Sequence, residues 1–129
     1  MFDEPDFPEV PLQVPGGTVD PGEALLEAAR REFEEETGLQ VESAFRFLGS
    51  VDHDFLKEGE RLTLHRNYFH LFLEGDQPDT WLHYEEKPSG GGEPILFRFF
   101  WIDLASAPSC LGLGLHELLD QLPHPTARA

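Results

Sequence analysis

The feature that most constrains this 129-residue chain is residues 17–39, a segment that predicts one helix with a defined start and end. Its sequence is GTVDPGEALLEAARREFEEETGL. Asp20 followed by Pro21 is a typical helix start, and Glu23 stands where a capping-box acid belongs. The stretch after Glu23 contains no glycine or proline until Gly38, which is a typical residue just past a helix end. The segment therefore predicts a helix that begins just after Asp20 and ends before Gly38.

Three acids gather near the end of this predicted helix. A helix turns by about 100° per residue, so Glu32 and Glu36 lie only about 40° apart around the axis. Glu35 lies about 60° to the other side of Glu32. Like charges at this spacing repel each other, and the C-terminal end of a helix dipole is unfavourable for acids. Divalent cations would remove both costs, since Mg²⁺ prefers carboxylate oxygens. The pattern therefore predicts a cation site.

The same segment resembles the Nudix box, G-x5-E-x7-R-E-U-x-E-E-x-G-U, where U is a bulky apolar residue. All nine specified positions match, although an aromatic residue stands where an aliphatic one is commoner. The matching residues are Gly17, Glu23, Arg31, Glu32, Phe33, Glu35, Glu36, Gly38 and Leu39.

The resemblance implies a Nudix hydrolase, in which a loop–helix–loop binds divalent ions beside a diphosphate. Glu35 and Glu36 look like metal ligands, and Glu32 is either a further ligand or the base that takes a proton from water. The backbone carbonyl of Gly16, just before the box, is implied as an additional ligand. The implied cofactor is Mg²⁺, with Mn²⁺ as a substitute.

The resemblance also implies supporting residues. Arg31 is expected to pair with Glu23 and to orient the loop and helix rather than touch substrate. Many family members use a further acid from a later strand or loop, and the candidates here are Glu85, Glu86 and Glu93. Glu93 is favoured, because it lies between a glycine-rich loop and a strongly apolar strand.

Other side chains are weaker candidates. Aromatic residues that stack on a nucleotide base are common in such enzymes, yet aromatic residues in apolar strands more often belong to the core. A single histidine is also more often structural than catalytic, and the spacing of these histidines does not suggest a zinc site. The stacking candidates are Tyr68, Trp81 and Trp101, and the histidines are His53, His65, His70 and His83.

The order of predicted elements is strand, helix, several strands and helix, which favours a mixed α/β or α+β sandwich in a single domain, residues 1–129. The resemblance implies an α/β/α sandwich with a mixed sheet. We expect an irregular arm over 1–11, a strand end at 12–14, a loop over 108–114 and a frayed tail over 123–129. Strands are expected near 45–51, 62–73, 81–84 and 95–102, and a final helix over 115–122.

The chain departs from the family pattern in front of the box. Nudix domains usually have a longer segment there, which holds one or two strands of the central sheet, whereas 16 residues precede Gly17 here. Either the true start lies upstream of Met1, or the fold lacks N-terminal strands. A missing strand would leave an exposed apolar groove. We therefore predict that a second copy covers this gap and forms a homodimer.

Charge and composition exclude several classes of function. The net charge is −16, from 25 acidic and 9 basic residues, and a surface of this kind repels nucleic-acid polymers. An anionic substrate then needs cations to approach. No apolar run is long enough to span a membrane, the acidic N-terminus does not resemble a signal peptide, and Cys110 alone excludes an internal disulfide. We expect a cytoplasmic protein.

Three interpretations follow. The leading one is an enzyme that cleaves a diphosphate bond in a nucleoside triphosphate, a nucleotide sugar or a dinucleoside polyphosphate. The second is a Nudix-fold module that senses a nucleotide without cutting it. The third is an acidic interaction protein whose helix only mimics the motif.

Overall fold

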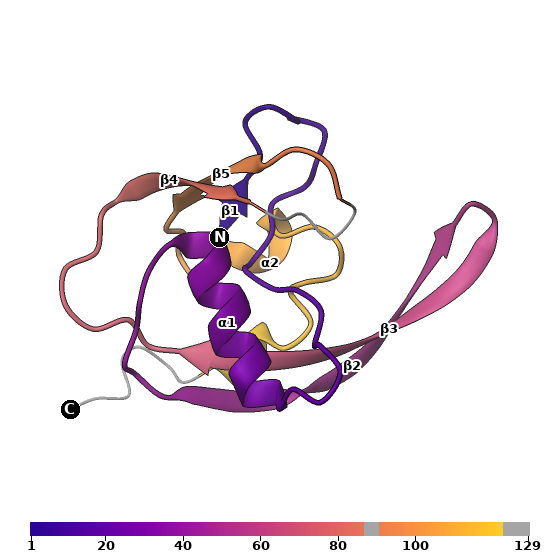
Figure 1. The fold of residues 1–129 in the computed structure, drawn as a ribbon, viewed down its shortest axis with the longest axis horizontal. Helices are drawn as coiled ribbons and strands as arrows, with labels where there is room; N and C mark the ends of the chain where they lie inside the picture. The colour runs from indigo at the N-terminus through magenta and orange to yellow at the C-terminus, as the bar shows by residue number, and fades with distance from the viewer. Residues whose placement is uncertain (87–90, 123–129) are drawn as a thin grey trace.

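The structure, a computed structural model, describes residues 1–86 and 91–122 (Figure 1). The expected tail over 123–129 and part of the expected glycine-rich loop lie outside this range. Helices and strands mix along the chain, which confirms the α+β class. The elements are β1 (Phe2–Asp3), α1 (Leu25–Thr37), β2 (Phe45–Lys57), β3 (Glu60–Leu71), β4 (Thr80–Glu85), β5 (Ile95–Phe100), α2 (Ala107–Cys110) and the 3₁₀ turn η1 (Leu119–Gln121).

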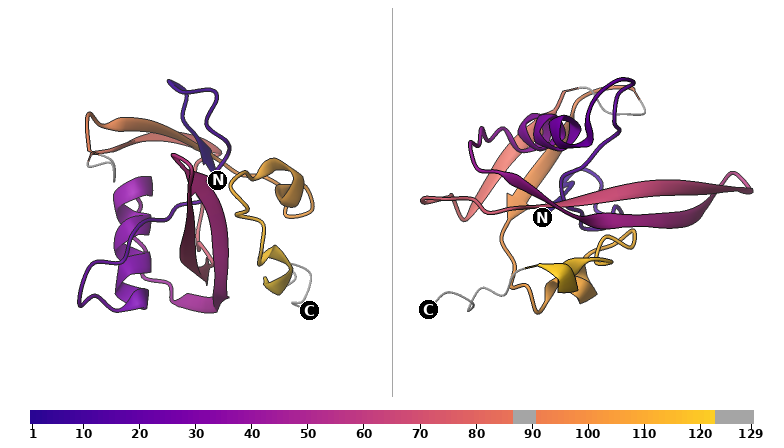
Figure 2. Two further views of the ribbon diagram at one scale, coloured as in Figure 1. Left: turned by 90° about the vertical axis from the view of Figure 1, so that its right-hand side faces the viewer. Right: turned by 90° about the horizontal axis from the view of Figure 1, so that it is seen from below.

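The strands form two antiparallel sheets. One is a three-stranded sheet in the order β1-β5-β4, and the other is the long hairpin of β2 and β3. The hairpin lies between α1 on one side and the C-terminal segment with α2 on the other (Figure 2). Helix α1 contacts both β2 and β4, so it joins the two sheets. This layered arrangement agrees with the sandwich that the family resemblance implies, but the described strands pair only antiparallel and not in the expected mixed sheet.

A bulge in β2 decides which side chains of the hairpin face α1. Phe47 pairs with Phe69, but the next paired residue, Gly49, pairs with Tyr68, so Leu48 is an extra residue in β2. Successive side chains of a strand point to opposite faces. The bulge therefore moves the odd-numbered residues of β2 from the face of Phe69 to the face of Tyr68.

The centre of the core is a cluster of three phenylalanines. The ring of Phe2 stacks on Phe97 at 4.1 Å between centroids and also contacts Phe99, and Phe2 is only 2% exposed. The expectation of an irregular arm over residues 1–11 is therefore wrong at Phe2 and its neighbour, which form β1 against β5. Local sequence could not indicate this strand, because its partner lies almost a hundred residues away.

Helix α1 ends as predicted but begins later. Gly38 takes the left-handed conformation, with φ of 75°, and its N–H donates to Glu34. The helix starts at Leu25, so the expected start after Asp20 is wrong. Gly22 has φ of 79°, which a right-handed helix does not accommodate. The expected contact of the capping-box acid exists within a turn instead, where Glu23 Oε1 accepts from the Asp20 N–H at 3.0 Å.

The strands predicted near 45–51, 62–73, 81–84 and 95–102 are all present, and β2 runs further than expected. The C-terminal elements differ from the prediction. The predicted helix over 115–122 is reduced to the 3₁₀ turn η1, and the helical turn α2 begins just before the expected loop over 108–114 and overlaps it. Leu113 and Gly114 have positive φ, so they interrupt any helix near this point. Within the described residues, no helix has the length and apolar character needed to cross a membrane.

Candidate functional site

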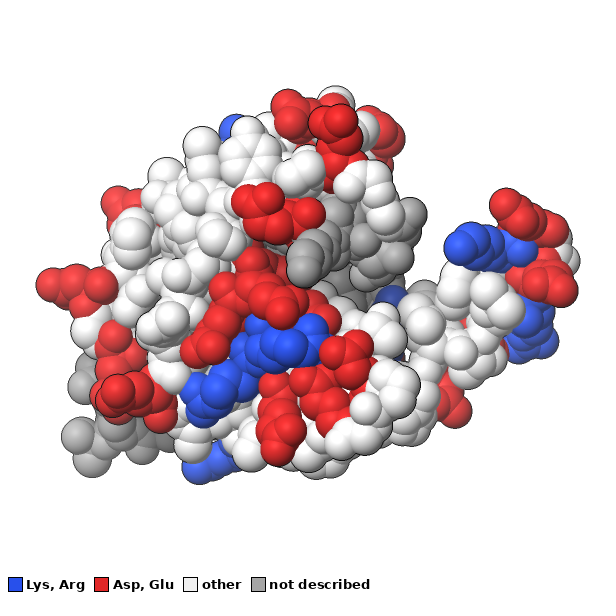
Figure 3. Space-filling view, viewed as in Figure 1, with Lys and Arg blue, Asp and Glu red and all other residues white. Residues whose placement is uncertain are grey.

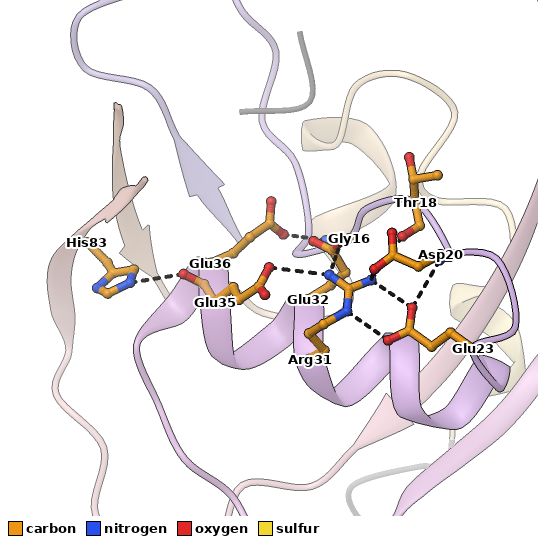
Figure 4. Close-up of polar contacts among 9 residues, drawn as sticks. All are labelled: Gly16, Thr18, Asp20, Glu23, Arg31, Glu32, Glu35, Glu36 and His83. Atoms are coloured by element: carbon orange, nitrogen blue, oxygen red, sulfur yellow. Dashed lines mark hydrogen bonds and ion pairs between the residues drawn. The ribbon is translucent and has the colours of Figure 1, made fainter. Parts of the chain in front are cut away.

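Arg31 ties the loop in front of α1 to the helix (Figure 4). Its Nε and one terminal nitrogen donate to the two carboxylate oxygens of Glu23 at 2.7 and 2.8 Å, and it also donates to the carbonyl of Thr18 at 3.0 Å. Hydrogen bonds from Arg31 are the largest cause that lowers the pKa of Glu23 to about 2. A bidentate pair of this kind fixes geometry as well as charge. The pairing is the one that the resemblance implies.

The same guanidinium reaches two of the three helix acids. One terminal nitrogen lies 2.8 Å from Glu32 Oε1 and 3.3 Å from Glu35 Oε2. Both carboxylates are therefore turned toward the loop rather than toward the end of the helix. Arg31 therefore pairs at the same time with Glu23 of the loop and with two acids of the helix.

Glu36 has a different environment. Its side chain is buried, with 5% of the residue exposed, and its Oε1 accepts from the Gly16 N–H at 2.6 Å. Burial raises the pKa of Glu36 to about 8, against the effect of the Gly16 hydrogen bond. Three nearby acids, Glu85, Glu32 and Glu35, each raise its pKa further. The structure thus places a buried acid among other acids.

Glu85 completes this cluster from another element. It is the last residue of β4, pairs with Ile95, and is partly buried. Burial raises its pKa, and the acids that raise it further include Glu32 and Glu35. Burial likewise raises the pKa of Glu32, while Arg31 opposes the shift. The cluster of Glu32, Glu35, Glu36 and Glu85 is called the acid cluster below.

The structure separates the three later candidate acids. Glu85 joins the acid cluster, whereas Glu86 and Glu93 are exposed, and Glu93 lies in the loop that leads into β5. Sequence reasoning favoured Glu93 over Glu85. A signal for Glu85 existed in the alternation of β4, because Trp81, His83 and Glu85 share one face of the strand.

That face of β4 also holds the last turn of α1. The indole N–H of Trp81 donates to the carbonyl of Thr37 at 2.9 Å, and His83 Nε2 lies 3.0 Å from the carbonyl of Glu35, to which it donates. Helix ends leave such carbonyl groups without partners inside the helix. Two side chains of β4 therefore satisfy carbonyls at the end of the helix that carries the acid cluster.

The glycine loop packs directly against Glu32. A Cβ atom added at Gly17 would lie 2.1 Å from Glu32 Cδ, which is far inside van der Waals contact. A Cβ atom added at Gly16 would meet nothing within 4 Å. A larger residue at Gly17 would therefore force the Glu32 carboxylate, the end of a flexible side chain, to move.

The stacking candidates serve packing in this structure. Trp81 stacks on Phe99 at 5.1 Å between ring centroids, and the Tyr68 hydroxyl lies 3.3 Å from Glu117 Oε1. Trp101 is half exposed, and its indole N–H donates to the carbonyl of Pro78 at 2.9 Å. Of the four candidate histidines, His83 contacts α1. The contacts of His53 and His65 are with Glu117 and Asp52, on the β2–β3 side.

The acid cluster suits a hard divalent cation. Figure 3 shows acidic side chains surrounding a small basic patch on the face that carries α1. The available donors are carboxylate oxygens and the backbone of Gly16, and these are the ligands that Mg²⁺ prefers. Within residues 1–86 and 91–122, no three His, Cys, Asp or Glu side chains converge closely enough to hold a metal ion. A cation held by several of these acids would therefore require their side chains to move closer together.

Comparison with protein families supplies the decisive observation. The family model of the NUDIX domain matches residues 2–122, which is almost the whole chain. The chain belongs to the Nudix family. Nudix hydrolases act on pyrophosphate bonds in compounds linked to a nucleoside diphosphate, and they generally use a divalent metal such as Mg²⁺. Comparison with curated proteins and with solved structures gave no match.

Proposed function

We propose that this Nudix protein is a Mg²⁺-dependent hydrolase that cleaves the diphosphate linkage of a nucleoside diphosphate derivative. The observation that carries the proposal is the buried carboxyl of Glu36, which lies close enough to three other acids for each of them to raise its pKa. Desolvation and mutual repulsion make this arrangement unfavourable for the protein alone. A bound cation would offset both effects, so metal binding would explain why a carboxyl group is buried at this position.

The residues of the acid cluster have distinct roles in this proposal. Glu35 and Glu36 would hold the cation, and the carbonyl of Gly16 would add a backbone ligand beside Glu36. When bound there, Mg²⁺ or Mn²⁺ would supply positive charge for the diphosphate oxygens and for activation of water. Arg31 and Glu23 keep the loop fixed against the helix, so they act as positioning residues.

A base must take the proton of the attacking water. Glu32 and Glu85 are the two carboxylates with raised pKa beside Glu36, and a raised pKa favours proton acceptance near neutral pH. Glu32 contacts Arg31, whereas Glu85 comes from a different element, the end of β4. Glu93, favoured from the sequence, stays a candidate for the same role.

The charge of the protein narrows the kind of substrate. A chain with a net charge of −16 repels an anionic diphosphate unless cations lie between them. A metal–nucleotide complex satisfies this condition, whereas a nucleic-acid polymer brings far more charge than the cluster can neutralise. Nucleoside triphosphates, nucleotide sugars and dinucleoside polyphosphates all meet the requirement.

The test is a panel of these three substrate classes, incubated with Mg²⁺ and analysed for nucleotide products. We expect turnover of at least one class, and Glu36→Gln should lower kcat/KM by about 10³-fold, the size expected when charge stabilisation in the transition state is lost. Glu27→Gln is the matched control, because Glu27 lies on the same helix but is exposed. This control should stay within about twofold of the wild-type rate.

Other outcomes would contradict the proposed hydrolase activity. Nucleotide binding without turnover, unchanged by Glu36→Gln, would indicate the sensor module instead. Absence of any effect of Mg²⁺ or nucleotide on thermal stability would indicate an acidic interaction protein. A cytoplasmic location remains a prediction.

A further inference from the structure

The β2–β3 hairpin extends far beyond the rest of the molecule. Figure 1 shows its turn end projecting away from α1 and from the three-stranded sheet. We call residues 53–64 the hairpin arm. A two-stranded hairpin alone is marginally stable in water, and it usually needs packing on at least one face. The arm therefore raises the question of what covers it.

One face of the hairpin is mostly polar, with the exposed Leu56 as an exception, and its polar side chains pair with one another. His65 Nδ1 lies 2.6 Å from Asp52 Oδ1, and the Thr63 hydroxyl donates to Asp54 at 2.6 Å. Arg61 completes this set through an ion pair with Asp54 at 2.8 Å. These pairs are exposed, as expected of a face that meets solvent.

The opposite face of the arm is apolar. His53 pairs with Leu64 and Phe55 pairs with Leu62, so the four side chains share this face. The rings of His53 and Phe55 are stacked, while Leu64 is 48% exposed and Leu62 is 37% exposed. Leu113, on the C-terminal segment, is another exposed apolar side chain at 49%. Within the part of the chain that the structure describes, His53, Phe55, Leu62 and Leu64 thus form an apolar strip that is partly open to solvent.

The C-terminal segment covers this same face only near the body of the protein. Glu117 forms an ion pair with Arg66 at 2.8 Å, and both side chains are largely buried. Glu117 Oε1 also lies 3.7 Å from His53 Nδ1, and a Cβ atom at Gly114 would lie 3.0 Å from the His53 ring. Coverage thus reaches His53, the first residue of the arm. The apolar strip beyond it is continuous with a packed interface inside the molecule.

We propose that a second copy of this chain covers the apolar face of the hairpin arm, with the two arms packed face to face about a twofold axis. The face is apolar on both copies, so it complements itself, as a twofold interface requires. Two amphipathic hairpins that bury their apolar faces together leave both polar faces in water.

The charge of the arm supports this occupant. Residues 53–64 contain three acidic and two basic side chains, which gives the arm a net charge of −1 in a chain with a net charge of −16. Figure 3 shows basic and acidic side chains side by side at the tip of the arm. Two copies of a strongly acidic protein repel each other over most of their surface, and the arm is a place where this repulsion is small.

The test measures mass as a function of concentration by analytical ultracentrifugation. The apolar strip is small for an interface, so we expect a reversible dimer that forms between about 5 and 200 µM. Leu64→Glu and Leu62→Glu each place a charge on the apolar face and should give monomers over this whole range. Both residues are partly exposed, and unchanged circular dichroism would show that the variants fold.

Leu56→Glu is the matched control. Leu56 lies on the same arm and is 75% exposed, but it pairs with Arg61 on the polar face. This variant should dimerise as the wild type does. A monomeric wild-type protein at every concentration overturns the proposal, and so does equal loss of the dimer in Leu56→Glu and Leu64→Glu. Co-sedimentation of wild-type protein, but not of Leu64→Glu, with vesicles of neutral phospholipid would instead assign the face to a lipid surface.

Discussion

Glu23 and Glu36 are two acids of the same motif with opposite environments. Glu23, at one end, receives two hydrogen bonds from Arg31, and its pKa falls to about 2. Glu36, at the other end, is buried beside further acids, and its pKa rises to about 8. The difference separates two tasks, because Glu23 holds the loop in place, whereas the proposed function assigns Glu36 to a cation. The charged form of the acid is thus stabilised at Glu23 and destabilised at Glu36.

The largest expected effect is on the pH dependence of stability without metal. The pKa of Glu36 is raised from 4.5 to about 8, so its contribution to stability is complete below about pH 4.5 and is lost as the pH rises toward 8. The lowered pKa of Glu23 acts in the opposite sense, and its contribution is lost as the pH falls from 4.5 toward 2. Thermal unfolding in a chelator should therefore show greatest stability near pH 5.

Glu36→Gln sharpens this prediction. The variant should be more stable than wild type at about pH 8.5, by up to a few kcal/mol, and nearly equal to it at about pH 5. Glu27→Gln should follow the wild-type profile. A Glu36→Gln profile parallel to that of wild type would mean that the pKa of Glu36 is not raised in the folded protein.

The next effect concerns Gly16 and Gly17, in the loop in front of α1. Gly17→Ala should displace the Glu32 carboxylate and lower kcat/KM by about 30-fold, since displacements of about 1 Å at a reacting centre have effects of this order. Gly16→Ala has open space at its Cβ position and should remain within about threefold of wild type. Steady-state kinetics on the preferred substrate compares the two. Equal losses would show that the close approach to Glu32 is unimportant.

The smallest effect distinguishes the two later acids. Glu85→Gln should lower activity by at least about tenfold, because Glu85 belongs to the acid cluster, whereas Glu93→Gln should leave activity within about twofold. Rates measured across pH would also show an altered profile for Glu85→Gln alone. The reverse result would favour Glu93, as expected from the sequence, and would exclude a role for Glu85 in the reaction.

Local sequence was sufficient for features that depend on local geometry. The end of α1 at Gly38 and the grouping of Glu32, Glu35 and Glu36 follow from helical spacing and from the conformational freedom of glycine. The approximate positions of the later strands followed from runs of apolar residues. The start of α1 could also have been placed better, because Gly22 directly follows Pro21 and favours a turn over a helix.

Features that depend on distant partners were missed. The strand at Phe2 exists because β5 and the phenylalanine cluster accept it, and nothing near Phe2 indicates those partners. The place of Glu85 in the acid cluster depends on where β4 meets α1. The bulge at Leu48 is similar, because the alternation of β2 looks regular until the register with β3 is known. Long-range pairing, rather than propensity, decided these three cases.

The alternation of β4 has a consequence for the evolution of the protein. Trp81, His83 and Glu85 each act on α1 or its acid cluster, whereas the intervening Leu82 and Tyr84 are 61% and 50% exposed. Selection on catalysis should therefore restrict every second position of this strand and leave the positions between them free to drift. A library of variants across β4 would then show a two-residue rhythm of tolerated and rejected substitutions.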